Sequence, residues 1–488
     1  MNETSEFRSP RDSDGHGTHT ASIAAGRYVF PASTLGYAKG VAARMAPKAR
    51  LAAYKVCWNA GCYDSDILAA FDSAVANGVD VISLSVGGAV VPYYLDAIAI
   101  GAFGAADKGI FVSASAGNGG PGGLSVTNVA PWMATIGAGR MYPLVYAGSG
   151  GGDGYSSSLC LEGSLDPDFV KGKIVLCDRG INSRDAKGDV VKKAGGVGMI
   201  IANGVFDGEG LVVDCHVLSA TAVGASNADE IRQYIDSASK SNAPPTATIV
   251  FKGTRLGVRP APVVASFSAR GPNPETPEIL KPDVIAPGLN ILAAWPDQVS
   301  PSGIPSDYRR TEFNILSGTS MACPHVSGLA ALLKVGMAMG RVGSGFWATR
   351  PDPRRKGFSP VTRLDPTKLS PAAIKSALMT TAYTVDNCGE TMIDESNGNT
   401  STVFDFGSGH GHPTKAMDPG LVYVQLRWIT QVTNVGDPNS VYKVTMRPPS
   451  GTLVTVEPQQ LLFRRVGQKL NFLVRVEAMA VSPPEAVA

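Results

Sequence analysis

The stretch LSGTSMACPHVSGLAALLK, residues 316–334, decides the fold and the chemistry that we expect of this chain. Ser320 follows Gly318 and Thr319 and opens a long run of small and apolar residues, which predicts a buried helix with the serine in its first turn. A helix N-terminus has unpaired N–H groups and a positive dipole end, and both stabilise the oxyanion that forms when a serine attacks a carbonyl. Ser320 is therefore a candidate nucleophile, although a lone serine ahead of a buried helix is more often only its N-cap.

A second segment, DSDGHGTHTASIAAG at residues 12–26, places His16 between two glycines at the start of another small-residue run. Histidine titrates near neutral pH, so an accessible ring at the mouth of a helix suits a general base. The simplest alternative is a glycine-rich turn that enters a packed helix. Zinc binding by His16 and His19 is a weaker alternative, because their spacing is poor and no third ligand is evident.

The third segment is SASAGNGGPG, residues 113–122, in which Asn118 follows an apolar strand and is surrounded by glycines. Its side-chain amide can donate a hydrogen bond to a developing oxyanion. A turn asparagine with left-handed backbone geometry is the alternative for this motif taken alone.

The pattern around these segments is that of an α/β fold with a parallel sheet covered by helices. In such sheets, functional groups collect at the carboxyl ends of the strands. Strands are expected at Leu51–Trp58, at Val79–Gly88 and within Gly109–Gly120, and helices at residues 64–78 and at about Tyr94–Lys108. Short strands between glycine-rich turns follow from about residue 140 to 253, which indicates an inserted α+β module, and the tail from about residue 430 reads as short strands of a β-sandwich.

Composition narrows the class of protein. The chain has 488 residues, of which 44% are hydrophobic and 17% charged, with a net charge of +2, so it is globular and gives no reason to expect nucleic acid or a membrane surface as a partner. No stretch reaches the roughly 18 apolar residues of a membrane span. Among seven cysteines, Cys57 with Cys62 and Cys160 with Cys177 are close enough in sequence to pair, and Cys323 is expected to be buried.

GHGTH, the SAGN loop and GTSMACPHVSG, in this order along one chain, resemble the His, oxyanion-Asn and Ser regions of subtilases. Other segments, among them TNVAPW, SFSARGPN and LKPDVIAPGLNILAAW, resemble the plant branch of that family. The resemblance covers most of residues 5–334 and 369–480. A lipase-type hydrolase with a nucleophile elbow around Ser320 is a rival that the order of His before Ser disfavours.

The resemblance implies a serine endopeptidase that hydrolyses peptide bonds through an acyl-enzyme and needs no cofactor or metal. It implies a subtilisin-like parallel sheet between helices in a split peptidase domain (1–139 and 254–424), an inserted α+β protease-associated domain (140–253) and a partial fibronectin III-like β-sandwich (425–488). The implied roles are His16 as base, Ser320 as nucleophile, Asn118 as oxyanion donor, and Ser85, Val86 and Gly87 as the edge strand that pairs with an extended peptide substrate. The inserted domain is a candidate contact for a homodimer.

The sequence also departs from the family pattern. The family takes its triad aspartate from a strand upstream of the His region, and the residues before His16 contain no such strand; we interpret Asp12 and Asp14 as turn residues. Residues 335–367 resemble nothing in the family, and segments after ATIGAG and after DPGLVY look deleted. Three interpretations are open: an active endopeptidase, a peptide-binding relative with an incomplete triad, and an incomplete version of a longer protein.

Localisation is expected from the resemblance alone. A full-length family member would be secreted to the cell-wall space or to the vacuole. The residues after Met1 do not form a basic-then-apolar signal peptide, so we expect either an intracellular protein or a longer natural N-terminus.

Overall fold

The computed structural model describes residues 9, 11–43, 45–58, 60–139, 154–205, 207–240, 245–249, 258–277, 279–338, 370–423, 431–445 and 452–478. These residues form two compact units. One unit lies within Met1–Leu332 and Ala382–Gly411, and the other within Leu333–Thr381 and His412–Ala488.

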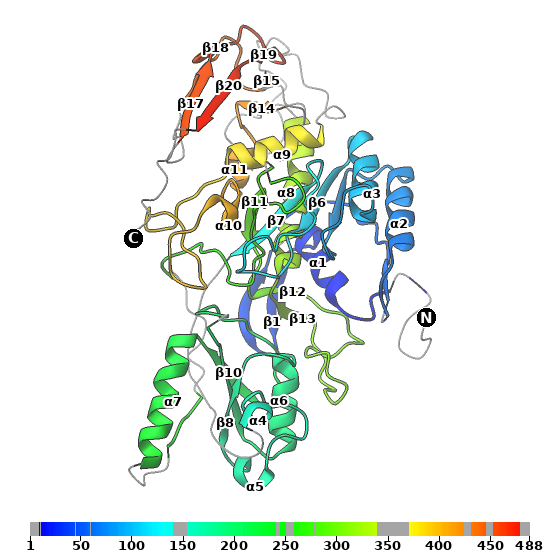
Figure 1. Cartoon of the computed structure of the whole chain (residues 1–488). Helices are drawn as coiled ribbons and strands as arrows, with labels where there is room; N and C mark the ends of the chain where they lie inside the picture. Colours follow the sequence, from blue (N-terminus) through cyan, green and yellow to red (C-terminus); the bar gives the residue numbers. More distant parts are fainter. Residues whose placement is uncertain are drawn as a thin grey trace, which may run out of the picture. The chain divides into compact units, whose positions relative to one another are not determined.

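A four-stranded parallel sheet is the centre of the first unit (Figure 1). Its order is β11 (Val284–Pro287), β7 (Ala134–Gly139), β6 (Phe111–Ser115) and β5 (Val81–Leu84). All three pairings are parallel, so the carboxyl ends of the strands meet at one edge. β6 is buried along its whole length, whereas β5 is an edge strand with half-buried and exposed residues.

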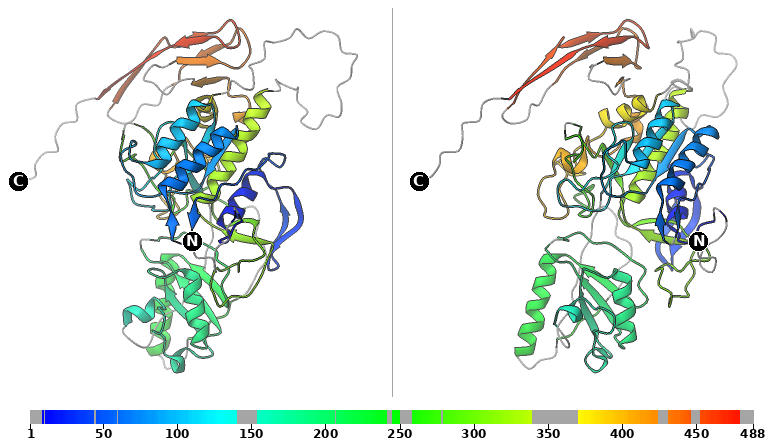
Figure 2. Two further views of the ribbon diagram at one scale, coloured as in Figure 1. Left: turned by 90° about the vertical axis from the view of Figure 1, so that its right-hand side faces the viewer. Right: turned by 45° about the vertical axis from the view of Figure 1, so that its right-hand side comes forward.

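Helices cover both faces of this sheet. α2 (Asp64–Ala76) and α3 (Ala97–Asp107) lie side by side (Figures 1 and 2) and pack on the face that presents Val112 and Ala114 of β6. α8 (Thr319–Ala338) lies on the opposite face, where the Ser113 hydroxyl donates to the carbonyl of Cys323 at 3.2 Å. Successive side chains of β6 point to opposite faces of the sheet, so Val112 and Ala114 contact the pair α2 and α3, whereas Ser113 contacts α8, the helix that carries Ser320.

The helix with the predicted base, α1 (His16–Ala25), precedes a small all-β region. The hairpin β1 (Val29–Thr34) and β2 (Tyr37–Ala42) packs Ala32 and Ala42 against Phe313. Phe313 belongs to a second hairpin, β12 (Ile291–Ala294) with β13 (Phe313–Leu316). After β2, the next strands in the chain form a short disulfide-linked hairpin, β3 (Cys57–Trp58) with β4 (Gly61–Cys62).

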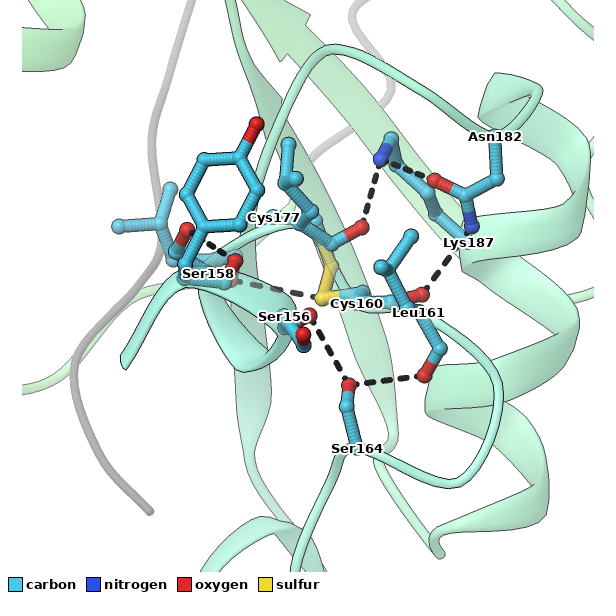
Figure 3. Close-up of a disulfide and its surroundings, with 11 residues drawn as sticks. Ser156, Ser158, Cys160, Leu161, Ser164, Cys177, Asn182 and Lys187 are labelled. Atoms are coloured by element: carbon cyan, nitrogen blue, oxygen red, sulfur yellow. Dashed lines mark hydrogen bonds between the residues drawn. A yellow bond between two sulfur atoms is a disulfide. The ribbon is translucent and has the colours of Figure 1, made fainter. Parts of the chain in front are cut away.

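The inserted module has its own three-stranded parallel sheet in the order β10 (Ser219–Val223), β9 (Gly198–Ala202), β8 (Ile174–Asp178). Its helices are α4 (Gly154–Ser158), α5 (Pro167–Val170), α6 (Arg184–Lys193) and α7 (Ala225–Lys240). The buried disulfide Cys160–Cys177 ties the chain after α4 to β8 (Figure 3). Beside it, the buried Lys187 ammonium donates to the Leu159 carbonyl at 2.6 Å and also approaches the side-chain oxygen of Asn182 (Figure 3). The Asn182 amide in turn donates to the Cys160 carbonyl at 3.2 Å.

The rest of the chain adds short elements. In the first unit, α10 (Val403–Phe406) is closed by a capping box between Thr402 and Asp405. In the second unit, α9 (Pro371–Thr380) packs Ala373 and Ala377 against Val422. The other elements of that unit are α11 (Pro413–Ala416), β14 (Leu421–Tyr423), β15 (Gln431–Asn434), β16 (Val441–Lys443), β17 (Thr452–Glu457), β18 (Gln460–Leu462), β19 (Lys469–Asn471) and β20 (Leu473–Ala478).

Most elements expected from the sequence are present, and one is wrong. The run Leu51–Trp58 was expected to be a strand, but residues 51–56 have no strand pairing and only Cys57–Trp58 form a ladder, with Gly61–Cys62. An apolar run becomes a strand only where a neighbour takes its backbone hydrogen bonds, and none does so here among the described residues. Of the anomalous residues 335–367, those up to Ala338 belong to α8. Those from 339 onward lie outside the described residues.

Both cysteine pairs that the sequence allowed are disulfides, and Cys323 is fully buried. Cys215 and Cys388 are the remaining free thiols. No helix in the described ranges combines the length and the apolar character needed to cross a membrane. The predicted boundaries of the three domains stay predictions.

Candidate active site

Asn118 and Ser320 meet at the carboxyl edge of the central sheet. Asn118 follows β6, and Ser320 lies in the first turn of α8. The side-chain oxygen of Asn118 accepts hydrogen bonds from the Thr319 backbone N–H (2.8 Å) and hydroxyl (3.0 Å). Asn118 therefore caps the helix that carries Ser320, and because its oxygen is engaged, its amide nitrogen is left as a donor.

Thr319 holds this arrangement from the other side as well. Its hydroxyl oxygen accepts the Gly117 N–H at 3.1 Å while its hydroxyl hydrogen goes to Asn118. A Cβ on Gly318 would lie 3.2 Å from the Asn118 amide nitrogen, so only glycine lets the two segments approach without displacing the amide. The sequence marks Thr319 only by its place in GTS and predicts no role for it.

His16 begins α1, and the sequence around it explains its placement. Gly15 has a φ of 107°, and a Cβ there would meet the Trp295 ring at 2.4 Å, so this turn requires glycine. α1 approaches α8 closely at one point, where a Cβ on Gly328 would meet the Ala24 carbonyl at 2.6 Å, and Ile23 and Met321 belong to one buried cluster.

The ring of His16 is half-buried, and its electrostatic environment favours the neutral form. Burial lowers the pKa of His16 below its usual value, against the opposing effects of Asp14 and Asp12. A neutral imidazole is the form that can accept a proton from a hydroxyl. Within the described ranges, no carboxylate hydrogen-bonds to this ring, and no hydrogen bond joins it to the Ser320 hydroxyl.

Asp12 is a turn residue, as interpreted from the sequence, and it also binds the first turn of α1. Its carboxylate accepts the backbone N–H groups of Asp14 (3.0 Å), Gly15 (2.8 Å) and Thr18 (2.6 Å), and the Thr18 hydroxyl (2.6 Å). Burial would raise the pKa of Asp12, but these hydrogen bonds outweigh it and lower the pKa below its ordinary value. The aspartate is thus ionised at the N-terminus of α1, where it also complements the helix dipole.

His19 has a structural role. It is fully buried, and its Nε2 atom lies 3.1 Å from the Ile291 carbonyl and 3.2 Å from that of Asn314. One N–H shared between two carbonyls holds α1 on the β12–β13 hairpin. Among the described residues, no group of three or more His, Cys, Asp or Glu side chains could hold a metal ion, so the zinc alternative has no support there.

The predicted substrate strand, Ser85, Val86 and Gly87, continues directly from the edge strand β5. The Ser85 hydroxyl donates to the Ser320 carbonyl at 3.0 Å, which places this segment beside the nucleophile. The Asn128 amide donates to the Val86 carbonyl at 2.8 Å and fixes the segment from behind. Pairing of this segment with a peptide stays a prediction.

Comparison with known proteins shows the family of the chain. The Subtilase family profile matches residues 1–411, and a fibronectin type-III domain profile matches residues 422–487. Subtilisin-like protease SBT1.5 of Arabidopsis thaliana is 64% identical over 575 aligned positions, covering 99% of this chain and 70% of that protein. SBT1.6 of the same plant is 48% identical, covering 98% and 70%. A solved structure, the prenylagaramide maturation protease PagA, overlays with a TM-score of 0.39 at 16% identity over 83% of this chain and 82% of its own.

The chain therefore belongs to the subtilase family of serine endopeptidases. It is similar to the plant subtilisin-like proteases, with a C-terminal fibronectin III-like domain. Because the alignment with SBT1.5 is longer than the 488 residues of this chain, that relative has internal segments with no counterpart here.

Proposed function

We propose that Ser320 attacks the scissile carbonyl, that His16 takes its proton, and that the Asn118 amide with the Ser320 backbone N–H stabilises the oxyanion. The scissile C–N bond then breaks and the amine leaves with the proton that His16 took, which gives an ester between Ser320 and the acyl part of the substrate; water then hydrolyses this ester and regenerates the Ser320 hydroxyl. The observation that carries this proposal is the cap of α8 by Asn118, which engages its side-chain oxygen with Thr319 and leaves its amide nitrogen beside Gly318 as a donor.

The substrate is a protein or peptide bound as an extended strand along Ser85–Gly87. The hydrogen bond from Ser85 to the Ser320 carbonyl keeps this segment next to the nucleophile. An extended peptide on the open edge of β5 would gain main-chain hydrogen bonds and would present one carbonyl to Ser320.

A fluorophosphonate probe tests these roles on the full chain. We expect covalent labelling that Ser320→Ala abolishes and that His16→Ala slows by about 10²–10⁴-fold, the usual contribution of a general base. Ser73→Ala, an exposed serine on α2, is the matched control and should label like the wild type. A folded wild-type protein that binds an extended peptide but is not labelled would instead be a peptide-binding relative.

Two further expectations belong to this proposal. The disulfides Cys57–Cys62 and Cys160–Cys177 support an oxidising location, outside the cell or in the vacuole. A fluorescent fusion of the full-length protein found in the cytosol would contradict that location.

The inserted module supports a homodimer because it exposes the apolar side chains of Ile181 (75%) and Val205 (82%). Sedimentation of the wild type and of Val205→Asp tests the homodimer, and a monomeric wild type would refute it.

A further inference from the structure

A turn between β11 and β12 holds the residues that immediately precede the nucleophile. The Gly288 carbonyl accepts the Gly318 N–H at 2.7 Å. The backbone N–H of Asn290 donates to the Ser317 hydroxyl oxygen at 2.8 Å, and that hydroxyl donates back to the Asn290 side-chain oxygen at 3.1 Å. These bonds fix the approach of the chain to Ser320 through Ser317 and Gly318.

The same side-chain oxygen of Asn290 is also bound by the inserted module. It accepts the backbone N–H of Val213 at 2.9 Å. An amide oxygen has two lone pairs, so the Ser317 hydroxyl and the Val213 N–H together saturate it. Asn290 has a φ of 54°, a left-handed backbone conformation that is uncommon for residues other than glycine.

The segment after Val213 is anchored on the peptidase side by a second set of contacts. The Arg309 guanidinium donates to the carbonyls of Cys215 (2.6 Å) and His216 (2.9 Å), and two of its nitrogens also bond the Asp307 carboxylate (2.8 Å each). The Cys215 thiol donates to the side-chain oxygen of Asn314 on β13 at 3.0 Å. The insert is thus seated on the hairpin strand that leads directly to Ser320.

We propose that Asn290 is a positioning residue of the peptidase reaction, through which the seating of the inserted module sets the approach of Ser317 and Gly318 to the nucleophile. This inference rests on the proposed role of Ser320. Small displacements of a nucleophile are costly, since a shift of about 1 Å reduces the rate by roughly 100-fold. Because the bond between Gly318 and Gly288 remains without the Asn290 side chain, we expect a part of that loss.

The test compares side-chain variants at Asn290 in the full chain. Asn290→Gly removes the amide and keeps the positive φ, and Asn290→Asp keeps the accepting oxygen. Asn439, which is exposed and has a φ of 61°, gives the matched control Asn439→Gly. We expect Asn290→Gly to lower the limiting rate of fluorophosphonate labelling by about 10-fold without changing the half-saturating probe concentration, a fraction of the loss for a full 1 Å shift. Asn290→Asp and the control should stay near the wild-type rate.

A second comparison tests the link to the module. Arg309→Gln should slow labelling in the wild type and add nothing in the Asn290→Gly background, because Asn290 is the step that the two share. Hydrogen exchange of the Gly318 amide gives a readout without catalysis, and it should be faster in Asn290→Gly. If the wild type is not labelled, the proposed function fails, and the exchange result still decides the link. The inference would be overturned if Asn290→Gly had the same labelling rate and the same Gly318 exchange rate as the wild type.

Discussion

Replacing either member of a buried Asp–His pair should change how the stability of the protein depends on pH. Asp185 Oδ1 lies 3.8 Å from His216 Nδ1, and their side chains are 19% and 10% exposed. Burial and the neighbouring carboxylate of Asp214 raise the pKa of Asp185 to about 7. Burial lowers the pKa of His216 to about 4. The other charged groups that face the pair are Arg184, Asp307 and Arg309.

The two shifts oppose each other. Between pH 4 and 6.5 the folded pair holds one proton, on Asp185, and the unfolded pair also holds one, on His216, so the proton counts match and the effects cancel. Alone, the His216 shift makes stability rise with pH across this window, because the unfolded state binds the extra proton. Alone, the Asp185 shift makes stability fall, because the folded state binds it. At about 1.4 kcal/mol per pKa unit, each effect amounts to roughly 3 kcal/mol over the window.

The assay is urea unfolding of the wild type and two variants at the two ends of this pH window. Asp185→Asn should lose about 3 kcal/mol on going from the neutral to the acid end, and His216→Gln should gain a similar amount, relative to the wild type. Asp236→Asn, an exposed acid on α7, is the control and should follow the wild type. Parallel pH profiles for all the proteins would refute the proton sharing described for Asp185 and His216.

Three further predictions concern the site and its support. Asn118→Ala and Asn118→Asp should both reduce kcat by about 10²–10³-fold, since both lose the donor while the aspartate keeps the cap on α8. Gly328→Ala should destabilise the protein by about 1–3 kcal/mol in urea unfolding by forcing α1 away from α8, and Gly104→Ala, an exposed α3 glycine with no atom within 4 Å, should not. Lys281→Met should cost about 3–5 kcal/mol in the same assay, because it removes the buried ion pair in which the ammonium lies 2.7 Å from the Asp283 carboxylate.

Each of these has an outcome that contradicts it. Full activity in Asn118→Asp would show that the donor is not used. Gly328→Ala with unchanged stability would mean that α1 and α8 can separate freely. The double variant Lys281→Met with Asp283→Leu should recover much of the loss, and if it is as unstable as Lys281→Met, the loss of the ion pair is not the cause.

Local signals in the sequence were enough to predict the helices and the functional loops. The helix expected at residues 64–78 is α2, which ends at Ala76, just before Gly78 with its φ of 68°. The GTS and SAGN motifs placed Ser320 and Asn118 at the start of a helix and the end of a strand, and the structure has them there. These features depend on a few consecutive residues, so one sequence contains all the information that they need.

Contacts between distant segments could not be predicted in the same way. The bonds from Thr319 to Asn118 and from Val213 to Asn290 join residues far apart in the chain, through a backbone N–H in each case. Every non-proline residue has such an N–H, so residue type alone does not mark these partners. Their positions follow only when the sheet order and the seat of the inserted module are known.

The strand that was wrongly expected at Leu51–Trp58 also shows that contacts between distant segments cannot be predicted from a local pattern. Residues 51–56, LAAYKV, and residues 111–115, FVSAS, are both short runs rich in apolar residues. The second run is β6, because β5 and β7 flank it and take its hydrogen bonds on both sides. The first run has no such neighbour within the described ranges, and Leu51 is 62% exposed. A strand is a property of a pairing rather than of a run of residues, so periodicity can nominate both segments and only the arrangement of their neighbours decides between them.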